Sequence, residues 1–186
     1  MTMRFGLAVA VAAGILWAAG ARAQAQAPTP GSPAVLRAVF PEADRFDADD
    51  VLLTADMAKR LDELARSRIP ERLVTFYTAR LGPAVLGHAV LQSHVVRTKR
   101  ETLLVAFEPD GRLRKLQVVA FLEPPEYKPS ERWLAQFAGK GTGDRLAVGD
   151  DIAFISGATL SARGVAEQSR WLLQALRMAR EAGKVK

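Results

Sequence analysis

Hydrophobic and polar positions alternate through the middle of the chain. Runs rich in β-branched and aromatic residues are separated there by turn residues, a pattern that predicts strands. The four predicted strands are 72–80, 85–96, 102–108 and 113–121. Pro109-Asp110-Gly111 joins the last two and is a strong β-hairpin signal. Strands that follow one another through short connections form an antiparallel meander rather than a parallel βαβ array.

Ahead of these strands the apolar spacing changes to that of helices. Residues 34–40 read as a short amphipathic helix that Pro41 ends, and 45–53 read as a further strand. Thr54 can cap the next helix, which we expect to run toward Pro70. Its apolar residues recur at helical spacing and predict one buried face: Met57, Leu61, Leu64 and Ala65.

Two more helices are predicted after the strands. Ser130 can cap a short helix that ends at Gly139, and 160–182 form a long amphipathic helix. The side expected to face the core carries Val165, Ser169, Leu172, Leu173, Leu176 and Ala179. The opposite side carries Arg163, Glu167, Arg170, Arg177 and Arg180. The predicted fold class is therefore α+β, an antiparallel β-meander packed against helices with a long C-terminal helix.

The N-terminus has the organisation of a secretory signal. Arg4 precedes the uncharged apolar run 5–20, and Ala21-Arg22-Ala23 has the small-x-small form that signal peptidase cleaves. We interpret 1–23 as a signal peptide cleaved near Ala23, which predicts a periplasmic location or the extracytoplasmic face of the cytoplasmic membrane. An uncleaved membrane anchor is the alternative, although the run is short for a span of about 20 residues.

Domain boundaries follow from the composition after the signal. Residues 24–33 are rich in Ala, Gln, Pro and Gly and read as a flexible linker. Residues 34–186 then suffice for a single domain with its own core. We divide it into an N-terminal helical part, 34–70, and a second part spanning about 84–182.

Charge and cysteine content exclude several classes of function. The formal net charge of +6 falls to +4 once Arg4 and Arg22 leave with the signal, and acidic residues interrupt the basic helix face, so nucleic-acid binding is not expected. The absence of Cys excludes thiol nucleophiles, iron–sulfur clusters and thioether-linked haem. His88 and His94 share one face of a predicted strand, but two ligands make a poor metal site, so none is predicted. The basic cluster Arg97-Thr98-Lys99-Arg100 could meet an acidic redox partner, lipid head groups or a phosphate, or simply form a solvated turn.

The entry to the last helix is the segment richest in chemical possibilities. Ser156-Gly157-Ala158-Thr159 combines small residues with hydroxyls, and free amides at a helix N-terminus attract phosphate. An ordinary helix cap, in which Ser156 or Thr159 accepts a backbone N–H, is the alternative reading. Residue chemistry alone leaves both open.

This segment, continued by Leu160-Ser161-Ala162-Arg163-Gly164-Val165, resembles the signature of the FMN-binding domain found in the C subunit of sodium-pumping NADH:quinone reductase and the G subunit of the Rnf electron-transport complex. The hairpin at Pro109-Asp110-Gly111 and the exit from Val119 to Pro125 resemble that family's strand-turn-strand and following loop. The resemblance covers roughly 86–182.

The resemblance implies a site and a cofactor. The family's Thr carries FMN through a phosphoester installed by a flavin transferase, and here that position is Thr159. Ser156, Gly157, Ala158 and Leu160 would line the phosphate and ribityl end, and Glu123 takes the place of the family's loop Glu near the flavin. The family's pattern has Asp three residues before the Ser, where this chain has Ala153.

An isoalloxazine ring prefers an apolar or aromatic slot, so Tyr127 is a further candidate contact, while Trp133 and Phe137 are more simply read as core residues. The resulting hypothesis is an exported, membrane-associated flavoprotein that transfers electrons to a membrane or periplasmic redox partner. It assigns no catalytic acid or base, and a component of a redox complex is expected rather than a stand-alone enzyme. The alternative is a non-redox module that binds an anionic or phosphorylated ligand at 156–160.

Overall fold

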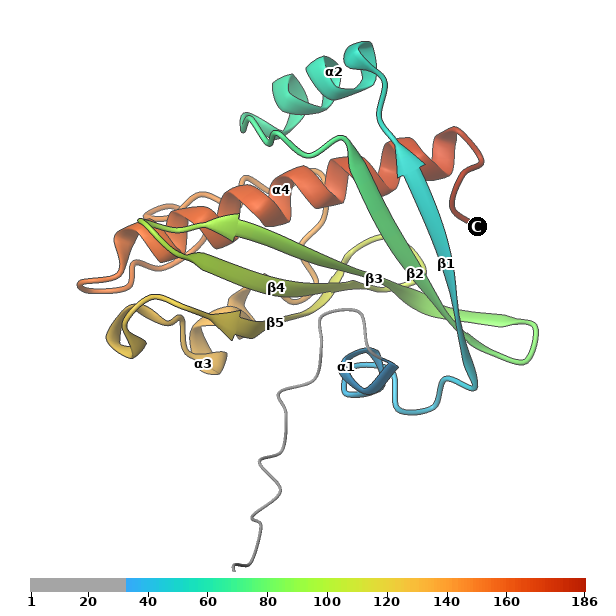
Figure 1. Ribbon diagram of the computed structural model, residues 1–186, viewed down its shortest axis with the longest axis horizontal. Coiled ribbons are helices and arrows are strands. Elements are labelled where there is room, and N and C mark those ends of the chain that lie inside the picture. Colours follow the sequence, from blue (N-terminus) through green and yellow to red (C-terminus); the bar gives the residue numbers. More distant parts are fainter. Residues whose placement is uncertain (1–32) are drawn as a thin grey trace, which may run out of the picture.

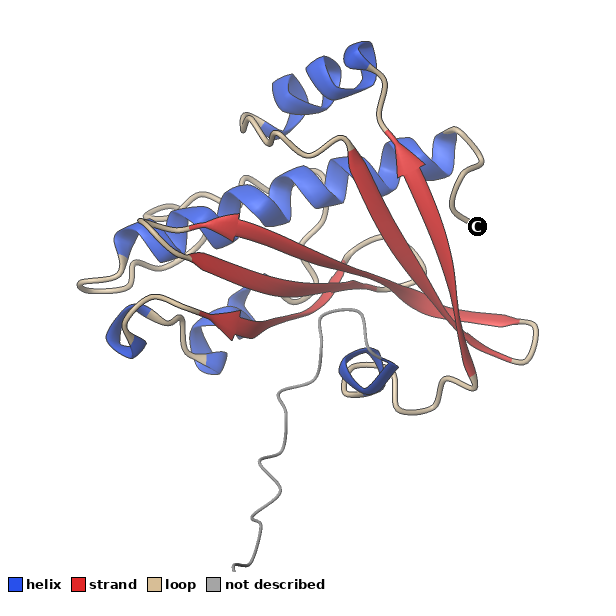
Figure 2. Ribbon diagram, in the orientation of Figure 1, coloured by secondary structure: helices blue, strands red, loops and turns tan. Residues whose placement is uncertain are grey.

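The computed structural model describes residues 33–186, so the predicted signal peptide 1–23 and nearly all of the linker 24–33 lie outside the described residues. Five antiparallel strands form one sheet in the order β1-β2-β3-β4-β5, which confirms the predicted meander (Figures 1 and 2). The strands are β1 Arg45–Leu52, β2 Leu73–Leu81, β3 Ala84–Val95, β4 Arg100–Phe107 and β5 Leu113–Phe121. The α+β fold class is confirmed as well.

Helix α2, Ala55–Ala65, connects β1 to β2 along the chain. Thr54 caps it as predicted, because its Oγ1 accepts a hydrogen bond of 3.2 Å from the Met57 N–H. The helix ends earlier than expected: Arg66 adopts a left-handed conformation with φ 48°, and its N–H bonds back to Glu63. Leu64 is 43% exposed, so its predicted place in the core is wrong, whereas Leu61 and Ala65 are buried.

Helix α4, Thr159–Glu181, crosses one face of the sheet, and the short helix α1, Pro33–Arg37, packs against the other (Figure 1). Strand residues alternate between the two faces. In β4, Leu103, Val105 and Phe107 join the core under α4, while the intervening Leu104 and Ala106 join the smaller cluster under α1.

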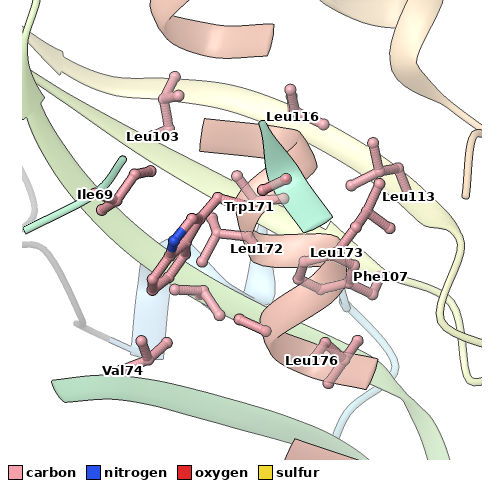
Figure 3. Close-up of a cluster of buried hydrophobic side chains, with 14 of the residues drawn as sticks. Ile69, Val74, Leu103, Phe107, Leu113, Leu116, Trp171, Leu172, Leu173 and Leu176 are labelled. Carbon is pink, nitrogen blue, oxygen red and sulfur yellow. The ribbon is translucent and has the colours of Figure 1, made fainter. Parts of the chain in front are cut away.

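The main hydrophobic core is the interface between α4 and the sheet. The predicted inner face of α4 is buried throughout: Val165, Ser169, Leu172, Leu173, Leu176 and Ala179. Figure 3 shows Trp171 and Leu172 among strand residues such as Leu103. The Trp171 indole N–H donates to Asp62 Oδ1 at 3.1 Å, which joins α4 to α2.

The structure corrects the prediction that Arg170 lies on the side of α4 opposite the core. Its guanidinium donates to the carbonyl oxygens of Ala65 at 3.0 Å and Leu146 at 2.6 Å, and the side chain is half-buried. Burial lowers the pKa of Arg170 from its ordinary value. The residue thus joins α4 to the end of α2 and to the loop before the helix.

The chain returns from β5 to α4 through short helical turns. They are η1 Pro125–Tyr127, α3 Glu131–Leu134 and η2 Ala135–Phe137. Ser130 Oγ accepts the Trp133 N–H at 3.2 Å, which confirms the predicted cap. Trp133 and Phe137 meet edge to face with ring centroids 5.3 Å apart, and both belong to the main core. Their interpretation as core residues is confirmed.

Candidate functional site

The turn that leads into α4 leaves the start of the helix uncapped. Gly157 has φ 77°, which places it in the left-handed region that favours glycine. Ala158 occupies the N-cap position with no side-chain hydrogen bond to the helix. Within residues 33–186, the hydroxyls of Ser156 and Thr159 form no hydrogen bond, so the ordinary cap is not formed.

The first backbone donors of the helix are consequently free. The N–H groups of Thr159, Leu160 and Ser161 have no acceptor in the described part of the chain. Such groups carry the positive end of the helix dipole. The Thr159 residue is exposed, so its hydroxyl is open to a reagent or enzyme from solvent.

A cavity of about 240 Å³ lies at this turn. It brings together Tyr127, Gly157, Ala158, Thr159 and Leu160, which are five of the predicted site residues. Ser161 and Arg97 complete the lining. Ser156 is next to the cavity in sequence but does not line it. The structure thus gathers residues from three separate parts of the chain around the exposed start of α4.

Arg97 supplies a positive charge to the cavity. Its guanidinium carbon lies 4.9 Å from the centre of the Tyr127 ring, a cation–π arrangement. Within residues 33–186, no carboxylate forms an ion pair with Arg97. The sequence predicted Arg97 only as one member of a basic cluster. It did not indicate that Arg97, rather than Lys99 or Arg100, would line the cavity with Thr159.

Glu123 holds the turn that carries Arg97. Its Oε1 accepts the backbone N–H groups of Arg97, Thr98 and Lys99 at 3.2, 2.7 and 2.8 Å. The amide hydrogen bonds from Thr98 and Lys99 hold the pKa of Glu123 below its ordinary value. Glu123 does not line the cavity at Thr159, so the structure gives it a supporting position behind Arg97.

Asp151 organises the loop before the site. Burial alone would raise the pKa of its carboxyl, but hydrogen bonds from the Ala147 and Leu146 amides and from Lys140 Nζ lower it overall. The three contacts measure 2.7, 3.0 and 3.2 Å. The acidic residue nearest to the signature is therefore engaged within its own loop.

Ala153, three residues before Ser156, is held through its backbone. Its carbonyl accepts the Trp133 indole N–H at 2.7 Å, and its N–H donates to Gln136 Oε1 at 2.9 Å. A buried tryptophan usually finds a hydrogen-bond partner for its indole N–H. The presence of Trp133 was therefore the one signal in the sequence for a contact of this kind, although it did not identify Ala153 as the partner. The segment leading to Ser156 is thus attached to the helical turns after β5.

The two histidines sit apart on the α4 side of β3. His88 Nδ1 lies 3.1 Å from Thr78 Oγ1, whereas His94 Nε2 lies 3.2 Å from Glu101 Oε2. Burial, reinforced by Arg180 and Arg80, lowers the pKa of His88 to about 4. In the described residues no three His, Cys, Asp or Glu side chains gather as metal ligands, and none of the helices there is long and apolar enough to cross a membrane.

Comparison with known proteins adds no family to this picture. No protein-family model and no curated protein matches the chain.

Proposed function

We propose that the protein is an exported FMN-binding electron-transfer protein whose flavin is attached through a phosphoester to Thr159. The observation that carries this proposal is the uncapped start of α4, where an exposed Thr159 hydroxyl shares a cavity with Arg97. The resemblance of Ser156-Gly157-Ala158-Thr159 to the flavin-domain signature supplies the identity of the ligand. Export rests on the signal-like sequence 1–23.

The cavity has the properties that a phosphate group requires. Free N–H groups at 159–161 and the helix dipole favour an anion, and Arg97 adds a full positive charge. An ester to Thr159 would keep negative charge on the remaining phosphate oxygens directly at these donors. Glu123 contributes indirectly because it holds the backbone on which Arg97 is displayed.

The residues around the phosphate position can also hold the rest of a flavin. Tyr127 and the half-exposed Leu160 offer aromatic and apolar surface at the cavity. When bound, FMN supplies the electron-transfer chemistry, and the protein binds and orients it. A flavin transferase would install the ester, and a membrane or periplasmic redox protein would exchange electrons with the flavin.

The test is the intact mass of protein exported by a host that contains a flavin transferase. We expect cleavage near Ala23 and an added FMN that survives denaturation. Thr159→Ala should abolish the addition, whereas Thr142→Ala should retain it, because Thr142 lies in an exposed loop outside the Thr159 cavity. A flavin that remains attached to Thr159→Ala after denaturation would refute the ester.

A second function is supported by the same uncapped helix start. A non-redox module could bind another phosphorylated or anionic ligand there. Protein that gains no FMN, covalently or by added FMN, but binds inorganic phosphate in calorimetry would favour this module over the flavoprotein.

A further inference from the structure

Strands β2 and β3 pair over only part of their length. Their register ends where Tyr77 stands opposite Ala89. Beyond that point β2 pairs only with β1 as far as Leu73, and β3 pairs only with β4 as far as Val95. Figure 1 shows the two strands diverging, β2 toward α2 and β3 toward the turn at 96–99. The sheet therefore has two open strand edges in its interior, separated by a gap.

A hydrogen bond at the end of β3 indicates which backbone groups point into this gap. The Val96 N–H donates to the Lys99 carbonyl in the turn that leads to β4. In an antiparallel strand, successive residues direct their N–H and C=O groups alternately to the two sides. Counting back from Val96, the groups of Leu91, Ser93 and Val95 point away from β4 and into the gap. In the described part of the chain, no strand or loop pairs with them.

The facing edge of β2 follows the same rule. The Leu53 N–H donates to the Arg72 carbonyl, so Arg72 and Val74 direct their backbone groups toward β1. The groups of Leu73 and Thr75 consequently point into the gap. The open edge of β3 is the longer of the two, with three residues whose donors and acceptors are free.

Two cavities follow the open edge of β3. A cavity of about 210 Å³ lies where the strands diverge, between 90–92 of β3 and the following residues of β2: Leu73, Val74, Thr75 and Tyr77. A second cavity, of about 560 Å³, is lined by the next residues of β3, 93–96. Open space thus borders the edge over 91–95, a length of about 17 Å in a strand.

Apolar side chains flank the gap on the α1 face of the sheet. Leu91 packs against the smaller core cluster there, and Ser93 and Val95 share its face because side chains alternate along a strand. Val95 and, across the gap, Leu73 are each 55% exposed. Leu52, opposite Leu73 in β1, is 64% exposed. Exposed apolar residues that gather in this way are typical of an interaction surface.

The outer edges of the sheet are protected against pairing, whereas this inner edge is not. Strand β1 carries four charged residues among its eight, and Leu113 at the start of β5 exchanges hydrogen bonds with Gly139 and Lys140. Charges and covering loops are common means of blocking a strand edge. Between Val90 and Val95, β3 contains no proline and no Lys, Arg, Asp or Glu. Its edge can therefore accept a further strand.

We propose that the open edge of β3, at Leu91, Ser93 and Val95, binds an extended segment of a partner polypeptide as an added antiparallel strand. An extended backbone supplies donors and acceptors at every second residue, which is the spacing of the free groups on this edge. The inference does not involve the flavin, so its outcome is independent of the proposed function.

The surroundings of the edge define the chemistry of the partner segment. Residues that bond to β3 would place their side chains on the α1 face beside Leu73 and Leu91, so apolar residues are expected at these positions. The intervening side chains would face the α4 side. The wider cavity carries charges of both signs, which favours polar residues there: Arg68, Glu71, Arg100, Arg163 and Glu167.

The probe is a synthetic peptide in which three valines alternate with two threonines, with a glutamate at each end for solubility. It is added to the exported protein, and amide hydrogen exchange is followed by NMR. At a peptide concentration ten times its Kd, exchange at Leu91, Ser93 and Val95 should slow by about tenfold. The amides of Gln92 and His94 already face β4 and should change little.

Two N-methylated peptides are the matched controls. Methylation of the three valines removes the donors that would face β3 and should abolish binding. Methylation of the two threonines alters N–H groups that point away from β3 and should leave binding within a few-fold of the parent peptide. Equal effects of the two modifications, or exchange at 91, 93 and 95 that the peptide leaves unchanged, would overturn the proposal.

A substitution in the protein tests the same edge. Val95→Pro removes an N–H directed into the gap and spares the pairing with β4, because the Arg100 carbonyl opposite it accepts from Leu122 instead. Loss of one hydrogen bond should raise the peptide's Kd roughly 2–10-fold, and Val95→Thr, which keeps the N–H, should bind like the wild type. The peptide series decides the question if Val95→Pro does not fold.

Other occupants of the edge would give different results. Slow exchange at 91, 93 and 95 without peptide, lost on dilution together with a dimer in ultracentrifugation, would assign the edge to a second copy of this chain. Slow exchange in the monomer that disappears on deletion of 24–32 would assign it to that segment. Either result would overturn the partner strand.

Discussion

Replacement of Arg170 offers the sharpest test of how the site is supported. The change Arg170→Met keeps much of the aliphatic stem and removes two hydrogen bonds, to the carbonyls of Ala65 and Leu146. A hydrogen bond from a charged donor contributes about 1.5–3 kcal/mol, and Arg170 is half-buried, so solvent will weaken each of these two. We expect a loss of roughly 3 kcal/mol in the free energy of unfolding.

The assay is urea unfolding of the mature protein at neutral pH, followed by circular dichroism. At roughly 2–4 °C for each kcal/mol, the same loss should lower the Tm by about 6–12 °C. Arg177→Met is the control, because Arg177 pairs with side chains of its own helix, Gln174 at 3.0 and 3.1 Å and Glu181 at 2.9 Å, and surface pairs of this kind should contribute only about 0.2–1 kcal/mol. A loss in Arg170→Met no larger than in this control would refute the reasoning.

Three further predictions concern side chains around the sheet. His88 is buried, and its pKa is lowered from 6.5 to about 4. Between these two pH values the unfolded state therefore binds more protons than the folded state, so the folded state loses stability as the pH falls. In urea titrations, the wild type should lose roughly 3 kcal/mol at most between pH 7 and pH 4, relative to His88→Asn. Under the proposed function, Glu123→Gln should loosen the turn that carries Arg97 and weaken the binding of added FMN to flavin-free protein in fluorescence titrations. Because the pKa of Glu123 is lowered in the folded state, the stability that this carboxylate provides should be lost as the pH falls from the ordinary carboxyl pKa through the lower value. Superimposable acid titrations of the wild type and Glu123→Gln would contradict this. Trp133→Phe should cost about 1 kcal/mol and accelerate hydrogen exchange at Ala153, which unchanged exchange would disprove.

Local patterns predicted the elements of the fold with good accuracy. Alternation in 113–121 and the turn at Pro109-Asp110-Gly111 describe interactions between neighbours in sequence, and β5 has the predicted bounds. The caps at Thr54 and Ser130 were predictable for the same reason, since each side chain bonds three residues away.

Contacts between distant residues could not be read from such patterns. Arg170 donates to a carbonyl 105 residues away, and Glu123 accepts from amides 24–26 residues earlier in the chain. Helical periodicity placed Arg170 on the side of α4 opposite the core. In the structure, the end of α2 and the loop at Leu146 contact this side chain. Likewise, the signature predicted a site at Thr159, but its meeting with Arg97 depended on the path of the whole sheet.

Glu101 also has a consequence for how β3 and β4 find their register. Strand β4 is buried on both faces from Glu101 to Phe107, and its last five residues are all apolar, so alternation alone distinguishes poorly between neighbouring alignments. In the native alignment Glu101 stands opposite His94 under α4. A slip of one residue would turn the carboxylate to the α1 face, and a slip of two would separate it from the imidazole while keeping it buried. An inward-pointing acid near the start of an otherwise apolar strand therefore selects one pairing among several that hydrophobic burial would accept.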